Sequence, residues 1–172
     1  MIKLAGGLLV LYAFTNLGFL VGARYLRRTV ELRQLQLALK TLQSEIGYTL
    51  TPLPEALDRV GRLTGGRVGQ IFERAGLLLR DGRHRSVAEA WTGAIEEEKR
   101  DLALAARDLA ILRELGNRFG GVDRKGHEKH LEQAMERLWQ EELSSLQAEK
   151  EYVRLWRYLG LLGGLAVVFL LA

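Results

Sequence analysis

GARYLRR, residues 22–28, decides how this chain is organised, because two opposite interpretations meet in it. The residues at 21–23 satisfy the small-residue rule for cleavage by a signal peptidase. The arginines that follow, Arg24, Arg27 and Arg28, are instead typical of the cations that hold the cytoplasmic end of a transmembrane helix in place. The first interpretation makes everything downstream an exported soluble protein. The second makes it a cytoplasmic domain anchored to a membrane.

The apolar run before these arginines has the length of a membrane span. Residues 4–23 carry no charge, and roughly 20 residues are what a helix needs to cross a hydrocarbon core of about 30 Å. The apolar region of a signal peptide is shorter, about 7–15 residues. Only Lys3 precedes the run, and a cation excess marks the cytoplasmic side of a span. The sequence therefore favours residues 1–23 as an anchor over an exported helical protein released at Ala23.

The C-terminus is also apolar, in the run YLGLLGGLAVVFLLA at residues 158–172. At about 1.5 Å per residue this run is about 22 Å long, and a snorkelling Arg157 beside Trp156 extends its apolar reach. Because Arg154 and Arg157 precede the run and no cation follows it, we predict a second span at 158–172. A buried core helix is the alternative. Both spans place residues 24–157 in the cytoplasm.

The composition excludes several classes of site and partner. The chain has no cysteine, so a disulfide framework, a thiol nucleophile and a cysteine-bound metal are all excluded. The net charge of +4 comes from the cations at the edges of the two apolar runs, and residues 29–153 carry a net charge of −2. A slightly acidic middle lacks the basic surface that nucleic acid requires. We therefore expect no nucleic-acid partner.

The middle of the chain has helical periodicity throughout. Apolar residues recur at three- and four-residue steps from Ala23 to Ile46, at Leu32, Leu35, Leu39, Leu42 and Ile46. Thr51 is suited to cap the next helix, with Pro52 at its first position and Pro54 in the first turn. A third helix carries Ile71, Phe72, Ala75 and Leu78 and closes near Gly82.

Three more helices complete the prediction. Ser86 and Glu89 form a capping box that opens the fourth, with Trp91 on its apolar side. The fifth carries Leu102, Ala105, Leu109 and Leu112 and runs to Gly120, and Asp123 caps the sixth. No segment alternates as a strand does. We predict an all-α bundle of about six helices, whose first and last helices are continuous with the two spans.

Catalytic motifs are nearly absent. Gly121 and Gly126 have the spacing of a phosphate-binding loop, but His127 stands where that loop needs lysine. His127 and His130 are three residues apart, which is not the spacing of a metalloprotease helix. We predict no catalytic residue, no cofactor, no metal and no small-molecule substrate. The alternative is a membrane-anchored hydrolase or metal-dependent enzyme that uses His127, Glu128 and His130.

Both spans contain glycines at the spacing that lets helices approach closely. Gly18 and Gly22 form this motif in the first span, and Gly160 and Gly164 form it in the second. Asn16 is a candidate for a hydrogen bond between spans. These residues are candidates for packing of the spans with each other or with a partner.

Two turns between helices are the candidate partner-contact sites. The first contains Thr51, Pro52, Leu53 and Pro54, and the second lies at Gly120–Gly126. The candidates in and just after the second turn are Gly121, Asp123, His127 and His130. The alternative is that both turns only separate one helix from the next. A non-enzymatic helical scaffold on a membrane is the leading hypothesis.

Three stretches of the chain resemble a known family. They are SEIGYTLTPLPEAL (44–57), DGRHRSVAEAW (81–91) and LGNRFGGVDRKGHEKHLEQAMERL (115–138). Together with spans of this arrangement they resemble the stage III sporulation protein AB family over essentially the whole chain. That family is itself similar to the cytoplasmic domain of the type II secretion F protein.

The resemblance implies a function. Such proteins belong to a secretion-like channel complex that links mother cell and forespore in endospore-forming bacteria. The implied location is the outer forespore membrane, with residues 24–157 in the mother-cell cytoplasm. The implied partners are other stage III sporulation channel proteins, including a secretion-type ATPase. Secretion F proteins generally carry two copies of the domain, whereas this chain has one, so a platform would require self-association or a partner.

Overall fold

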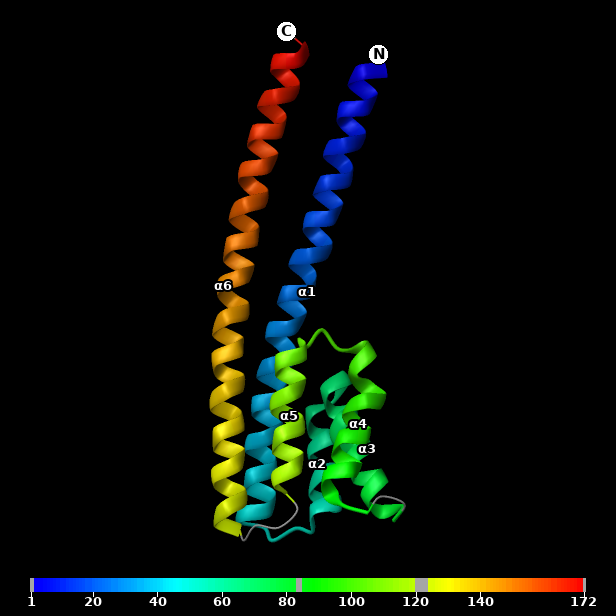
Figure 1. Cartoon of the computed structure of the whole chain (residues 1–172), viewed down its shortest axis with the longest axis vertical. Coiled ribbons are helices and arrows are strands. Elements are labelled where there is room, and N and C mark those ends of the chain that lie inside the picture. Colours follow the sequence, from blue (N-terminus) through cyan, green and yellow to red (C-terminus); the bar gives the residue numbers. More distant parts are fainter. Residues whose placement is uncertain (1, 83–84, 120–123, 172) are drawn as a thin grey trace. The chain divides into compact units, whose positions relative to one another are not determined.

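The computed structural model describes the backbone of residues 2–82, 85–119 and 124–171, and the side chains of residues 23–82, 85–119, 126–152 and 155. Within these residues all regular secondary structure is helical, as predicted. The helices are α1 (Ile2–Gly47), α2 (Leu53–Thr64), α3 (Gly66–Arg80), α4 (Val87–Glu98), the short 3₁₀-helix η1 (Lys99–Asp101), α5 (Ala106–Arg118) and α6 (Arg124–Leu171), as Figure 1 shows.

The chain divides into two compact units. One is the bundle, Arg28–Leu143, and the other is the terminal unit, Met1–Arg27 with Ser144–Ala172. The first and last helices contribute to both, because α1 has 46 residues and α6 has 48. The prediction that these two helices continue through the terminal apolar runs is therefore confirmed.

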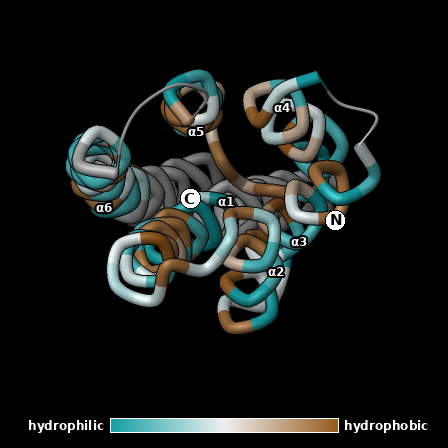
Figure 2. Tube along the Cα trace, turned by 90° about the horizontal axis from the view of Figure 1, so that it is seen from below, coloured by the Kyte–Doolittle hydropathy of each residue, from teal (hydrophilic) through white to brown (hydrophobic). Residues whose placement is uncertain are grey.

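The apolar stripe predicted for the first helix forms part of the core of the bundle. Leu32, Leu35, Leu39 and Leu42 are fully buried, and they join Phe72, Trp91, Leu112, Leu131 and Leu138 in one apolar cluster. Each helix presents an apolar side to this cluster. Figure 2 shows brown and teal segments alternating around the helical turns, which is the pattern of amphipathic helices.

Helices α2 to α5 pack as successive neighbours along the chain, α2 with α3, α3 with α4, and α4 with α5. Glycine makes the closest contact possible between α2 and α3. A methyl group on Gly61 would lie 2.8 Å from the Gly69 carbonyl oxygen, and one on Gly76 would lie 2.9 Å from the Pro54 carbonyl oxygen. Because any side chain at Gly61 or Gly76 would collide with backbone, glycine sets the spacing of this helix pair.

Helices α1 and α6 pair along the bundle through polar side chains. Arg33 donates to Glu142 at 2.6 Å, and Gln36 donates to the same carboxylate at 2.8 Å. Nearer the end of α1, Gln43 donates to Glu132 at 3.3 Å. As residue numbers increase along α1, the numbers of their partners on α6 decrease, so the two helices run antiparallel.

Two predicted helix ends differ from the structure, and a third is not tested by it. Pro52, not Thr51, occupies the N-cap of α2, and no side-chain hydrogen bond caps that helix. The fifth helix begins at Ala106, because η1 and an extended segment occupy residues 99–105. Asp123, the predicted cap of the sixth helix, lies outside the described residues.

The predicted capping box of α4 is confirmed in part. The backbone N–H of Glu89 donates to the Ser86 hydroxyl at 3.2 Å. The Glu89 carboxylate reaches back as the motif requires, but it accepts from the backbone N–H of Arg85 at 2.8 Å. The box is therefore one residue wider than the usual form, in which the N-cap residue itself is the donor.

In the terminal unit, Tyr25 and Tyr152 stack with ring centroids 4.9 Å apart. Among the residues described with their side chains, no helix has the length and apolar character needed to cross a membrane. The predicted spans at 1–23 and 158–172 lie outside those residues, Ala23 excepted. The same holds for the candidate packing residues, which are Asn16, Gly18, Gly22, Gly160 and Gly164.

Candidate functional site

The turn between α1 and α2 is held in place by hydrogen bonds to the end of α1. The backbone N–H of Thr51 donates to the Glu45 carbonyl at 3.1 Å, and its hydroxyl donates to the Glu45 carboxylate at 2.9 Å. Arg59 pairs with the same carboxylate at 3.2 Å. Leu50, directly before Thr51, has φ of 56°. This left-handed conformation is rare for a residue with a bulky side chain.

The consequence is an exposed apolar turn. Tyr48 is 87% exposed and Leu50 is 69% exposed. Of the predicted contact residues beside them, Pro52 is exposed and Leu53 is half-buried. Sequence analysis identified the turn but not the exposed Tyr48 and Leu50, because periodicity assigns Tyr48 to a helix end and gives no sign of the backbone conformation at Leu50.

The second predicted turn lies outside the described residues at Gly121 and Asp123, but its flanks are described. His127 donates through Nε2 to the Phe119 carbonyl oxygen at 3.2 Å, and the two rings are 5.6 Å apart. A methyl group on Gly47 would lie 3.1 Å from the Glu128 carboxylate. The end of α1 and the start of α6 therefore meet at one end of the bundle, which we call the turn end.

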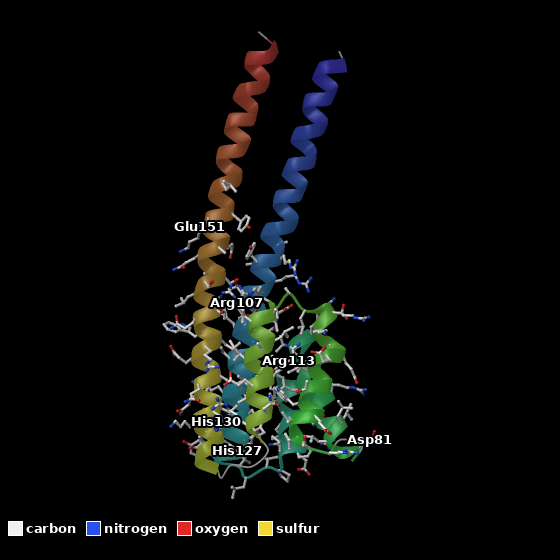
Figure 3. The ribbon with its side chains drawn as sticks, viewed as in Figure 1. Asp81, Arg107, Arg113, His127, His130 and Glu151 are labelled. Atoms are coloured by element: carbon white, nitrogen blue, oxygen red, sulfur yellow. The ribbon has the colours of Figure 1, made fainter. Side chains whose placement is uncertain are left out.

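The two histidines of α6, which Figure 3 labels, contact different partners. His130 Nδ1 lies 3.3 Å from Arg118 Nη1. Because a guanidinium only donates, Nδ1 is the acceptor in this contact. His127 is engaged with Phe119 instead. The structure does not join these histidines into one ligand set, and no group of three His, Cys, Asp or Glu in the described part of the chain is arranged to hold a metal.

A groove between α5 and α6 contains ion pairs. Glu114 accepts from Arg118 at 2.6 Å and also from Arg137. The hydrogen bond from Arg137, followed by the one from Arg118, lowers the pKa of the Glu114 carboxyl below its usual range. Two permanently charged guanidiniums keep this carboxylate ionised, so it is poorly suited to transfer protons near neutral pH.

The opposite end of the bundle, the ion-pair end, contains a buried charged cluster that sequence analysis missed. Arg28 donates two hydrogen bonds of 2.8 Å to Asp108 and one of 2.7 Å to Glu141. Asp108 is fully buried, and Arg28 is 13% exposed. The hydrogen bond that Arg28 donates to Asp108 raises the pKa of Arg28 above its ordinary value. This cluster joins α1, α5 and α6.

The predicted membrane-edge cations thus fall into different environments. Arg24 and Arg27 are exposed, whereas the charge of Arg28 is balanced inside the bundle. Arg154 and Arg157 lie outside the residues whose side chains are described. Only an interaction across 80 residues of sequence distinguishes Arg28 from its neighbours, and a single sequence contains no signal for it.

Comparisons with known proteins agree with one another. The family model described as stage III sporulation protein AB matches residues 3–172. A protein of Bacillus subtilis (strain 168) named stage III sporulation protein AB is 30% identical over 171 residues, which cover 99% of each chain. A solved structure of a stage III sporulation protein AB matches with a TM-score of 0.68 and 28% identity, over 73% of this chain and 98% of that one. The chain therefore belongs to the stage III sporulation protein AB family, and its role lies in sporulation.

Proposed function

We propose that this protein is a non-enzymatic membrane scaffold in a secretion-like channel complex between mother cell and forespore, where it is needed for endospore formation. Its bundle stands in the mother-cell cytoplasm and docks partner proteins onto the channel. The partners are other stage III sporulation channel proteins, including a secretion-type ATPase. Family membership supports the process, and the described geometry supports docking rather than catalysis.

The observation that carries the proposal is the turn end. Tyr48 and Leu50 expose two large apolar side chains on a segment that Glu45 and Thr51 hold with hydrogen bonds. An exposed and fixed apolar turn favours protein contact, because burying it in a partner releases water while little chain freedom remains to be lost. The left-handed Leu50 adds a local strain that a turn built only to join two helices would not need.

The membrane location rests on the sequence. Residues 1–23 and 158–172 are apolar and are flanked by arginines on the side of the bundle. Helices α1 and α6 continue through these runs without a break in the described backbone. We place the protein in the outer forespore membrane with two spans, both chain ends outside the mother-cell cytoplasm and residues 24–157 inside it.

Docking is tested by capture from sporulating cells. A double variant, Tyr48→Ser with Leu50→Ser, should lose the channel proteins and the ATPase that the wild-type chain captures. The control is Leu63→Ser, which removes an apolar side chain as exposed as Leu50 but near the end of α2, a helix length away from the turn. Equal capture by the double variant and the control contradicts docking at the turn end, and capture of no channel protein by the wild type contradicts the scaffold itself.

Topology is tested separately. The chain has no native cysteine, so single variants such as Leu63→Cys in the bundle and Ala172→Cys at the C-terminus report only their own position. When the chain is produced in cells that are not sporulating, so that it inserts in the cell membrane, a thiol reagent that cannot cross membranes should label Ala172→Cys in intact protoplasts, and Leu63→Cys only after lysis. Labelling of Leu63→Cys before lysis would refute the two-span arrangement.

A further inference from the structure

The outer side of the α1–α6 pair exposes a second apolar surface, distinct from the turn end. Four of the exposed large apolar side chains of the bundle lie on it, Val30 and Leu37 on α1 and Trp139 and Leu143 on α6. On α1, Val30 and Leu37 are seven residues apart and point away from the fully buried Leu35 and Leu39. Trp139 and Leu143 are four residues apart and therefore share one face of α6.

Contacts within the chain bring these two faces to one surface at matching heights. Gln36 bonds to Glu142, and Gln43 bonds to Glu132. Between these two rungs of the antiparallel pair, Leu37 lies level with Trp139, and Lys40 lies level with Glu136. The side chains of α1 that contact α5 and the residue 103 segment, Arg28 and Glu31, lie on its other side. The α1–α6 surface, defined as Val30, Leu37, Trp139 and Leu143 with their flanking charges, is thus left open in the bundle.

The charges that flank this surface are divided by helix. Arg33 and Lys40 are exposed on α1, and Glu132 and Glu136 are exposed on α6. One half of the surface is therefore basic and the other half is acidic, with apolar residues in both halves. A partner of uniform charge would be attracted to one half and repelled by the other.

A second copy of the same chain satisfies both halves at once. A two-fold axis parallel to the helices places α1 of one copy against α6 of the other without changing heights. Lys40 then faces Glu136 of the other copy, and Leu37 faces its Trp139. Each contact occurs twice, as an isologous interface requires. Two copies anchored in one membrane must also point the same way, and this axis preserves their direction.

We propose that the α1–α6 surface is a homodimer interface in which α1 of each copy pairs with α6 of the other. The proposal deepens the proposed function by naming a second copy of this chain as a partner. It uses residues away from the turn end, so its failure and the failure of docking at Tyr48 and Leu50 are separate results.

Charge reversal gives a test that only a two-fold interface passes. Two differently tagged copies of the full chain are co-expressed and captured from detergent. Lys40→Glu in both copies, or Glu136→Lys in both, should lower co-capture about tenfold, because two attractive contacts become repulsive. A Lys40→Glu copy mixed with a Glu136→Lys copy should associate as the wild type does, since each reversed charge meets its opposite in both contacts. Circular dichroism checks that each variant is folded.

Disulfide trapping tests the apolar contact. One tagged copy carries Leu37→Cys and the other carries Trp139→Cys, and mild oxidation of membranes should trap the mixed dimer because no native cysteine competes. A copy with Leu63→Cys, 69% exposed against 63% for Leu37, is the control and should not be trapped with Trp139→Cys. The proposal is overturned by wild-type copies that do not associate, by charge variants that associate as the wild type does, by a mixed pair that fails to recover, or by equal trapping of Leu63→Cys.

Discussion

Helix α5 is held at its two ends by opposite kinds of contact. At its start, the buried Asp108 binds Arg28, and Arg28 also binds Glu141. In its second half, the backbone of Gly116 lies against the Trp91 ring, and Trp91 Nε1 donates to the Leu112 carbonyl oxygen at 2.7 Å. The first contact depends on charge and crosses 80 residues. The second depends on shape and joins residues that are 21 apart in the sequence.

The difference teaches where this fold is most vulnerable. Buried ions lose their hydration on folding, so each needs its partner, and removing one leaves the other uncompensated. Removing or adding apolar volume at the second contact changes packing without leaving a charge behind. The ion-pair end should therefore respond more strongly to a single substitution than the Trp91 crossing.

The largest effect is expected for Asp108→Ala. It leaves Arg28 buried without its main partner and removes the acceptor for the backbone N–H of Ala105, which bonds Asp108 at 2.7 Å. We expect a loss of about 3–5 kcal/mol in the free energy of unfolding, measured by chemical denaturation of the full chain in detergent.

The combined variant Arg28→Met, Asp108→Leu, Glu141→Leu serves as the control for charge. Replacing a whole buried cluster by apolar residues of similar volume is often neutral, so it should recover most of the stability that Asp108→Ala loses. If the combined variant is as unstable as Asp108→Ala, the charge explanation is wrong.

The next effect is expected for Gly116→Ala. An added methyl group would overlap the Trp91 ring, and overpacking of a filled core costs about 1–3 kcal/mol. Asn117→Ala, at the next and exposed position of the same helix, should leave the unfolding midpoint nearly unchanged. A stable Gly116→Ala variant would show that α4 and α5 can separate without cost.

A smaller effect is expected for Trp91→Phe. The ring that packs edge-on against Phe72, with centroids 5.3 Å apart, is largely kept, but the indole hydrogen bond to Leu112 is lost. The expected cost is about 1–2 kcal/mol. Thermal unfolding followed by circular dichroism measures this cost. A cost equal to that of Asp108→Ala would contradict the expectation that the Asp108 end of α5 is more sensitive to substitution than the contact with Trp91.

The smallest effect is expected for Glu114→Gln, on the exposed side of α5. The pKa of Glu114 is lowered by the hydrogen bonds from Arg137 and Arg118. The stability it contributes is therefore present above the ordinary glutamate pKa of about 4.3 and is lost as pH falls through the lowered value. The variant should melt slightly below the wild type at pH 7, and the gap should close in acid or in high salt. A gap that persists in acid would mean that the contact is not ionic.

Much of the apolar architecture could be predicted from sequence. The stripe Leu32, Leu35, Leu39 and Leu42 is buried as its spacing indicates, and Trp91 lies on the core side of its helix. Periodicity succeeds here because an apolar face must be buried whatever covers it. The cap at Ser86 was also predictable, since capping is local in sequence.

Features that depend on distant partners were not predictable. Asp108 looks like an ordinary acid in the first turn of a helix, and only the folded chain brings Arg28 to it. The left-handed backbone of Leu50 has no signature in residue type, because glycine or asparagine is the usual choice there. The start of α5 was placed too early because apolar spacing continues through Leu102 and Ala105, which lie in an extended segment.

The pairing of α1 with α6 has a consequence for how the protein is made. A ribosome releases α1 first and α6 last, and the hairpin of α2 and α3 can form from neighbouring residues as soon as it emerges. The leucines of α1, by contrast, pack in one core cluster with Leu131 and Leu138, which are synthesised about a hundred residues later. Until synthesis ends, the first helix has only part of its cover, so a chain truncated before α6 would leave an apolar stripe that chaperones recognise and proteases remove.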